Sequence, residues 1–424
     1  MFSFMTEKTK EKMKRTTGKI INDPVLGFIS LPFPILYDLL QHPWLLRLAR
    51  IRQLGLSMLV YPGNTHSRLL HSLGAMHLTR KAIETLRGKG IRIEDEEAEA
   101  TLCAVLLHDI GHGPFSHALE GLLVKDMSHE EITLLLMRKL NEEMNGALEL
   151  AIKIFRDAYP RHFLHQLISS QLDMDRLDYL VRDSFFSGVR EGGIGAERLI
   201  DMLNVHDDRL VVDAKGLYSV ENFLIARRLM YWQVYLHKTD VAAETMLRHV
   251  TRRAQALARS GAELFGSPHL QRFLKQEISR DQIENDKDVL ADFCLIDDND
   301  VISALKVWNA HDDFTLRTLA TGIVERKLFK VKVSTDQETL EAEEAEMRNA
   351  YKKQFGLVDD EACLLTHCGK VSSRTYKVGE ENILIYDKSG NITELSSMSD
   401  IVNTNMLKHD TAKYYLCYYK AKKA

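Results

Sequence analysis

Apolar residues recur at helical spacing over most of the first 320 residues of the chain. Breaks in this pattern fall at residues 110–115 and 188–193, where glycine and proline gather. The expected helices cover residues 32–54, Arg68 to about Leu86, 94–109, further segments up to about 260 that include a long helix over 225–257, and a short helix over 300–311. The pattern therefore predicts a mainly α-helical core.

Strand-like patterns occur in two places. Arg209–Asp213 and Leu217–Val220 flank Ala214-Lys215-Gly216, which predicts a small β-hairpin inside the helical region. After residue 320, strand-like alternation at 327–333 precedes a charged helix over 338–355, and further strands are expected at Tyr376, 383–386 and 414–419. The expected fold is mainly α, a helical core with a small β-hairpin insertion and a C-terminal α+β subdomain.

Chain length and these patterns together predict three parts of the chain. At 424 residues the chain is long enough for more than one domain. We expect a polar N-terminal segment at 1–19, a helical domain at 20–320 and a small α+β domain at 321–424.

Composition and charge narrow the class of protein. With 45% hydrophobic and 27% charged residues, the chain has an ordinary globular composition. A net charge of -4 supplies no global basic field, so nucleic acid is a possible but not favoured partner, and a membrane is not expected. The chain has no signal-peptide-like start and no transmembrane-length apolar run, which predicts a cytoplasmic location. Five scattered cysteines fit free thiols in a reducing compartment.

A candidate metal site begins where an apolar helix ends. The run Leu102 to Leu107 stops at His108-Asp109, and His112 and His117 follow around Gly111, Gly113 and Pro114. Adjacent helical residues point about 100° apart, so both members of the pair can reach an ion between their directions. The glycines and the proline end the helix and free His112 and His117 to approach from a loop. A favourable histidine at a helix C-terminus is the alternative, but it does not explain three histidines.

Two other segments offer further ligands. His71 lies three residues after Arg68 and therefore beside it on one helix face, an arrangement that suits phosphate. The stretch from Asp173 to Asp183 crowds carboxylates and arginines onto another helix, where a solvated face is the alternative interpretation. Joining the segments gives His71, His108, Asp109 and one aspartate, most plausibly Asp175. Such a set suits Mn²⁺, Fe²⁺, Zn²⁺ or Mg²⁺ and leaves positions for water and substrate oxygens.

Motifs in a fixed order connect these residues. They are Asn22-Asp23-Pro24, Ile51-Arg52-Gln53-Leu54-Gly55, Tyr61-x-Gly63-x-x-His66-Ser67-Arg68, His71-Ser72-Leu73-Gly74, His108-Asp109-Ile110-Gly111-His112-Gly113-Pro114-Phe115-Ser116-His117, Ser128-His129-Glu130, Asp173-x-Asp175-x-x-Asp178-Tyr179-x-x-Arg182-Asp183 and Tyr235-x-His237-Lys238. With them the chain resembles the HD-domain phosphohydrolase superfamily and, within it, the SAM-and-HD-domain deoxynucleoside triphosphate triphosphohydrolases, without the SAM domain. The motifs span about residues 20 to 260.

The resemblance implies a role for each matching residue. His71, His108, Asp109 and Asp175 match the metal ligands, so a divalent metal ion is the expected cofactor. His112 would act as the general acid or base, supported by His129 and Glu130. The residues that would bind the nucleotide substrate are Gln53, Leu54, Arg68, His117, Arg176, Tyr179, Asp183, Arg227, Tyr235 and Lys238. Among them, Gln53 and Asp183 would bond a 3′-hydroxyl, and the Tyr179 ring would exclude a 2′-hydroxyl.

The resemblance therefore implies hydrolysis of deoxynucleoside triphosphates to deoxynucleoside and inorganic triphosphate. One alternative is an HD-type phosphomonoesterase or phosphodiesterase that acts on another nucleotide. A second is a protein that binds nucleotide or single-stranded nucleic acid without turnover. Relatives are often dimers of dimers, so a homo-oligomer, dimer or tetramer, is expected.

Overall fold

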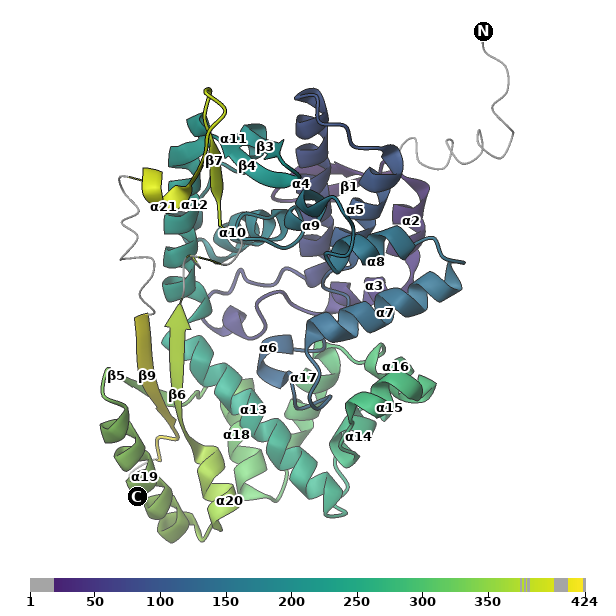
Figure 1. Ribbon diagram of the computed structural model, residues 1–424. Coiled ribbons are helices and arrows are strands. Elements are labelled where there is room, and N and C mark those ends of the chain that lie inside the picture. Colours follow the sequence, from purple (N-terminus) through teal and green to yellow (C-terminus); the bar gives the residue numbers. More distant parts are fainter. Residues whose placement is uncertain (1–18, 374–375, 377–378, 380–381, 400–410, 422–424) are drawn as a thin grey trace.

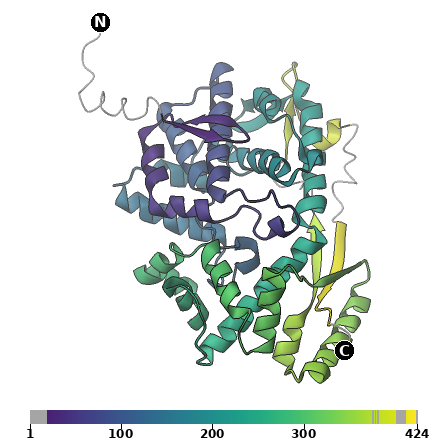
Figure 2. The same ribbon diagram turned by 180° about the vertical axis from the view of Figure 1, so that it is seen from behind.

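The computed structural model describes residues 19–373, 376, 379, 382–399 and 411–421, so nearly all of the polar segment expected at 1–19 lies outside the described residues. The fold is mainly helical, as the periodicity predicts (Figures 1 and 2). Up to residue 260 the helices are α2 (Pro34–Gln41), α3 (Pro43–Leu46), α4 (Arg68–Gly88), α5 (Asp95–Leu107), α6 (Ser116–Leu119), α7 (His129–Glu143), α8 (Glu149–Phe155), α9 (His162–Gln166), α10 (Met174–Ser187), α11 (Ala196–Met202), α12 (Leu217–Met230) and α13 (Lys238–Arg259).

After residue 260, every described helix but one has 11 residues or fewer. These helices are α14 (Pro268–Lys275), α15 (Arg280–Asn285), α16 (Lys287–Phe293), α17 (Asp298–Trp308), α18 (Phe314–Val324), α19 (Gln337–Phe355), α20 (Asp359–Ala362) and α21 (Leu395–Met398). The charged helix expected over 338–355 is confirmed as α19. None of the helices in the described part of the chain combines the length and the apolar character needed to cross a membrane.

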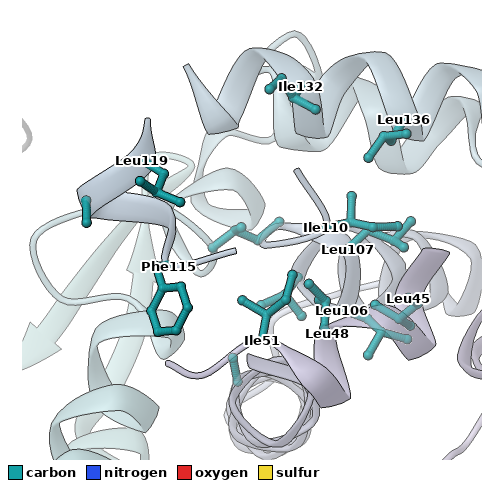
Figure 3. Close-up of a cluster of buried hydrophobic side chains, with 14 of the residues drawn as sticks. Leu45, Leu48, Ile51, Leu106, Leu107, Ile110, Phe115, Leu119, Ile132 and Leu136 are labelled. Atoms are coloured by element: carbon teal, nitrogen blue, oxygen red, sulfur yellow. The ribbon is translucent and has the colours of Figure 1, made fainter. Parts of the chain in front are cut away.

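Helix α4 is central to the first half of the molecule and packs against both α5 and α10. The end of α5 is held from several sides by apolar contacts. Leu106, Leu107 and Ile110 meet Leu48 and other side chains from the segment before α4 and from α7, as Figure 3 shows. All three are fully buried. The backbone that carries His108 and Asp109 is therefore anchored in the core.

The small β-hairpin lies earlier in the chain than the sequence predicts. Strand β3 (Leu203–His206) pairs antiparallel with β4 (Arg209–Asp213), whereas residues 217–220 form the start of α12. Asp207 and Asp208 make the turn, with φ of 48° and 56°. Two consecutive left-handed residues form the tight turn that hairpins favour, and aspartate tolerates this conformation better than most residues. The predicted pairing was wrong because the two aspartates were not recognised as the turn.

The long helix expected over 225–257 is interrupted in the structure. Helix α12 ends at Met230, Tyr231–Tyr235 form one π-helical turn, and α13 begins at Lys238. The ring Nδ1 of His237 caps α13 by accepting a hydrogen bond from the backbone of Thr239 at 3.2 Å. Apolar positions continue through the break, so periodicity does not reveal it. Such turns often occur at functional sites.

The short helix expected over 300–311 begins earlier, as α17, and α15 and α16 occupy part of the region before it. The side chain of Asp297 caps α17 by accepting a hydrogen bond from the backbone N–H of Asn299. The side chain of Asp300 accepts one from the backbone N–H of Asp297. Asp298 accepts backbone hydrogen bonds from Arg52 and from Phe115, each at 2.9 Å. This helix therefore ties together two loops that line the site described below.

The strands form three small sheets. They are the hairpin β1 (Ile20–Asp23) and β2 (Gly27–Ser30), the order β3-β4-β7-β8 with β7 (Leu384–Tyr386) and β8 (Ile392–Glu394), and the order β5-β9-β6 with β5 (Lys330–Ser334), β9 (Thr411–Tyr418) and β6 (Thr366–Ser373). Tyr376, expected in a strand, lies outside these strands and is buried, and its hydroxyl donates to Glu394 at 2.5 Å. Strand β7 pairs in parallel with β4. The division at residues 320 and 321 stays a prediction.

Candidate active site

A cavity of about 620 Å³ opens where α4, the end of α5, α10 and the start of α13 meet. Its volume falls in the range of small-ligand sites. The residues of the sequence-predicted site that line it are Gln53, Leu54, Arg68, His71, Asp109, His112, His117, His129, Glu130, Asp175, Arg176, Tyr179, Asp183 and Tyr235. Residues from six separate segments of the chain therefore meet in one space.

Three of the predicted ligands lie close together beside this cavity. The Nε2 atoms of His71 and His108 are 3.2 Å apart, and Asp175 Oδ1 lies 2.9 Å from the first and 3.5 Å from the second. Two atoms that each lie about 2.1 Å from one ion are about 3.0 to 3.4 Å apart at right-angled or tetrahedral geometry. The three donor atoms have the spacing that one metal ion requires.

The other ring nitrogens fix both histidines as ligands. His71 Nδ1 donates to Asp178 Oδ2 at 2.8 Å, and His108 Nδ1 donates to the carbonyl of Val105 at 2.6 Å. A carboxylate and a carbonyl only accept, so in the neutral rings both Nε2 atoms present lone pairs to each other. Facing lone pairs at this distance require a cation between or beside them. The residues present therefore fit a divalent ion.

Charge around His71 agrees with a cation site. Burial lowers the pKa of His71, but hydrogen bonds with Asp175 and Asp178 outweigh burial and raise the pKa to about 10. Asp178 in turn accepts hydrogen bonds from Nε and Nη2 of Arg182, each at 2.8 Å. Surroundings that hold a proton this firmly favour positive charge, which a metal ion can supply in its place.

Asp109 stands at the edge of this cluster. Arg68 Nη1 donates to Asp109 Oδ2 at 2.7 Å, and Asp109 Oδ1 lies 3.4 Å from His108 Nε2 and 3.2 Å from His112 Nε2. Burial raises the pKa of Asp109, but interactions with His108, His112 and Arg68 outweigh burial and hold the pKa well below its usual range. The group that meets metal-ligand spacing contains His71, His108 and Asp175. Asp109 as a fourth ligand stays a prediction.

Three histidines that line the cavity form a second group. The rings of His112 and His129 stack with centroids 4.0 Å apart, and His117 meets both edge-on. His112 Nδ1 is hydrogen-bonded to the hydroxyl of Ser116. Burial and then the charge of Arg68 lower the pKa of His112 well below its usual value, so the ring rests neutral.

Glu120 is the carboxylate that holds His129, and the support of His112 by Glu130 stays a prediction. Glu120 Oε1 accepts from His129 Nδ1 at 2.9 Å and from the His129 backbone at 3.0 Å. Glu130 lies 3.9 Å from His129 Nε2, and 73% of its side chain is exposed. As a support for His129, Glu130 is therefore the weaker partner, because hydrogen bonding falls off steeply beyond normal distance. Glu120 is nine residues before His129, and no motif connects the two.

Two predicted substrate residues do not line the cavity. Arg227 is buried, with its guanidinium over the Tyr231 ring at 5.8 Å, and Lys238 is exposed at the start of α13. Arg52, a motif member to which the resemblance gave no role, does line it, and its Nη1 is buried without a hydrogen-bond partner. The Nε of Arg68 is unpartnered as well. The cavity therefore holds unused donors next to the metal-ligand cluster.

The wall expected to contact a sugar is well ordered by hydrogen bonds. Asp183 accepts from His66 Nε2 at 2.7 Å and from the Tyr235 hydroxyl at 2.8 Å. The Tyr179 ring lies between His71 and Tyr235, with centroid distances of 6.5 and 6.1 Å. Gln53 Oε1 is buried and unpartnered. His66 and Asp178 were quoted only as motif members, and their supporting roles required the fold.

Comparison with known proteins gives the class. The HD domain family model matches residues 68–183, and the HD associated region matches residues 194–265. A crystal structure of a phosphohydrolase from Bacteroides thetaiotaomicron is 51% identical, covers 95% of this chain and 100% of its own, and superposes with a TM-score of 0.91. The chain belongs to the HD-domain phosphohydrolase family, as its motifs imply.

Two curated relatives bear on the substrate. The uncharacterized protein YwfO of Bacillus subtilis is 29% identical over 403 residues, covering 92% of this chain and 90% of YwfO. The deoxynucleoside triphosphate triphosphohydrolase SAMHD1 homolog of Dictyostelium discoideum is 29% identical over 252 residues, covering 55% of this chain and 49% of the homolog. Phosphohydrolase chemistry follows from the family.

Proposed function

We propose that this phosphohydrolase converts deoxynucleoside triphosphates to deoxynucleoside and inorganic triphosphate. The observation that carries the proposal is a single cavity that joins the His71, His108 and Asp175 cluster to arginines and to a tyrosine and aspartate wall. Metal ligands and arginines suit a polyphosphate, and the wall suits a sugar. The similarity to a deoxynucleoside triphosphate triphosphohydrolase supports the same substrate class.

Each group has a task in this reaction. The chemistry that a divalent ion supplies at such a cluster is activation of water and neutralisation of phosphate charge. Arg68 and Arg176 would bind phosphate oxygens, and Arg52 joins them because its Nη1 is unused. The water oxygen forms a bond to the α-phosphorus, the bond from that phosphorus to the 5′-oxygen breaks, and the 5′-oxygen gains a proton. His112, neutral at rest, would move that proton while His129 and Glu120 hold its ring.

Product analysis tests the proposal. The metal-loaded protein is incubated with each dNTP and with the matching NTP, under Mn²⁺ and then Mg²⁺, and the products are separated. Deoxynucleoside and triphosphate from dNTPs, with little turnover of NTPs, are expected. Release of monophosphate or of orthophosphate would contradict the proposal and favour another phosphohydrolase reaction. Binding without turnover under every metal would contradict it as well.

Tyr179→Ala is expected to weaken the selection of deoxyribose. The ring lies against His71 and Tyr235, where it would fill the space of a 2′-hydroxyl. We expect the ratio of kcat/KM for a dNTP over its NTP to fall by about tenfold or more, within the discrimination that a pocket achieves against an added hydroxyl. Tyr218→Ala, at a 65% exposed tyrosine outside the cavity, is the control. An unchanged ratio in Tyr179→Ala would remove this residue from sugar selection.

Glu120→Gln is expected to slow the reaction more than Glu130→Gln. The glutamine loses the charge that holds His129, and the pair His129–His112 loses its fixed position. We expect kcat to fall by at least about tenfold, with KM less affected, since proton-transfer groups are worth about 10²–10⁴. The shape of the kcat–pH profile is expected to change in Glu120→Gln. A larger loss in Glu130→Gln would support the assignment made from sequence.

A further inference from the structure

Helix α13 presents two carboxylates to the same cavity, and the reaction above does not use them. Asp240 and Glu244 lie one helical turn apart, so they share one face of α13 with Leu247, and all three line the cavity. Tyr235 and Leu236, which line it too, come just before this helix. The carboxylates therefore belong to the part of the cavity that begins at the Tyr235 wall.

Neither carboxylate has an ion-pair partner in the part of the chain that the structure describes. Asp240 is 5% exposed, and its Oδ1 is buried without a hydrogen-bond partner. In the described part of the chain, no lysine, arginine or histidine nitrogen forms an ion pair with either residue. Arg248, one turn further along α13, donates instead to the carbonyl of Ala118 at 3.3 Å. A buried polar atom without a partner is costly, so its presence next to a cavity points to a ligand donor.

The electrostatics of the pair agree with a missing hydrogen-bond donor. Burial and then the charge of Glu244 raise the pKa of Asp240 well above its usual range. Burial also raises the pKa of Glu244, to about 7, although Arg248 opposes this change. A bound N–H group would donate to the ionised carboxylate and offset the cost of burying it.

The cavity is therefore chemically divided. The metal-ligand cluster lies on α4, α10 and the end of α5, next to Arg68, which bonds Asp109, whereas the two carboxylates lie with Leu247 on α13. The apolar residues that line the cavity are Leu54, Leu56, Phe115, Ala118, Val234, Leu236 and Leu247. A nucleotide has the matching division, with an anionic phosphate chain and a flat base that carries a few polar groups.

We propose that Asp240 and Glu244 recognise the base of the bound nucleotide by accepting hydrogen bonds from its N–H groups, and that they select guanine over thymine. Guanine offers adjacent donors, the ring N1–H and the exocyclic amino group, which two acceptors can bind together. Thymine has one N–H between two carbonyl oxygens, and these oxygens would face the carboxylates as acceptor against acceptor. This inference rests on the proposed function for the substrate class and adds the residues that select the base.

Equilibrium binding tests the inference without turnover. Calorimetry in EDTA measures the Kd of dGTP and of dTTP for the wild-type protein and for Asp240→Asn, Glu244→Gln and Glu263→Gln. Glu263 is an exposed residue just after α13 and lies outside the cavity lining. Glu263→Gln therefore removes one negative charge, as Glu244→Gln does, without changing the cavity. Denaturation midpoints show whether each variant is folded. If one of the two cavity variants does not fold, the other still tests the inference.

The expected result is a preference for dGTP over dTTP of about tenfold or more in the wild type and in Glu263→Gln, falling below about threefold in Asp240→Asn and Glu244→Gln. An equal preference in wild type and both cavity variants would overturn the inference. So would loss of a divalent ion from these variants, measured by metal analysis of the proteins before EDTA is added, with unchanged base preference, because the pair would then be a second cation site. Altered base preference without any hydrolysis of dNTPs would reject the proposed reaction and keep the inference. Failure of the metal-loaded protein to bind any dNTP would reject both.

Discussion

Asp175→Ala is expected to lose its bound metal and its turnover together while the protein stays folded. Asp175 Oδ1 lies 2.9 Å from His71 Nε2 and 3.5 Å from His108 Nε2, and these three residues form the group that meets metal-ligand spacing. The Asp175 side chain is 29% exposed toward the cavity, so truncation leaves no buried hole. We expect kcat to fall by more than about a hundredfold, because even partners outside the ligand set are worth about 10- to 100-fold. Metal analysis after gel filtration and steady-state kinetics measure the two losses.

The control for this variant is Asp201→Ala. Asp201 is an exposed aspartate on α11 outside the cavity lining, so its removal is expected to leave metal content and kcat unchanged. Asp175→Asn, which keeps the size but not the charge, should lie between the two. If Asp175→Ala keeps both metal and turnover, the proposed ligand set is wrong. If it loses metal but keeps turnover, the ion is structural and the reaction needs another explanation.

Arg182→Met is expected to destabilise the protein by about 3–5 kcal/mol, the usual cost of removing one partner from a buried ion pair. The guanidinium donates to Asp178 at 2.8 Å and to Asp23 at 2.7 Å, and all three side chains are fully buried. Methionine fills much of the space but leaves two carboxylates without a cation. Urea denaturation followed by circular dichroism measures the free energy of unfolding.

The variant Arg190→Met provides the comparison. Arg190 is an exposed arginine shortly after α10, and a surface substitution of this kind changes stability by about 0.5 kcal/mol or less. Arg182→Lys should be intermediate, because lysine keeps the charge but cannot bond both carboxylates in the same geometry. A loss below about 1 kcal/mol in Arg182→Met would show that Asp23 and Asp178 find other partners. The chain Asp23–Arg182–Asp178–His71 would then not be the support of the metal site that we infer.

Much of the fold could be predicted from local sequence patterns. Helical periodicity and the glycine and proline breaks were enough to predict α4, α5 and α19, because a helix that packs on a core must repeat its apolar residues every three to four positions. The hairpin was misplaced because a turn of Asp207 and Asp208 carries no glycine. The interruption at Tyr231–Tyr235 was missed because a π-helical turn keeps the apolar character of its neighbours.

For the candidate site, sequence determined which residue types are present and in what order. Packing of an apolar helical core does not call for polar side chains such as His71, His108 and Asp175, so they indicate a functional site. Their motifs match one family. Tertiary structure decided which partner each residue has. Asp178 at His71, Glu120 at His129 and the unpartnered Asp240 in the cavity depend on how separate helices pack, and spacing along the chain does not encode distances between helices. The sequence therefore determined which reactive side chains the protein has, and the packing of the helices determined the distances between them.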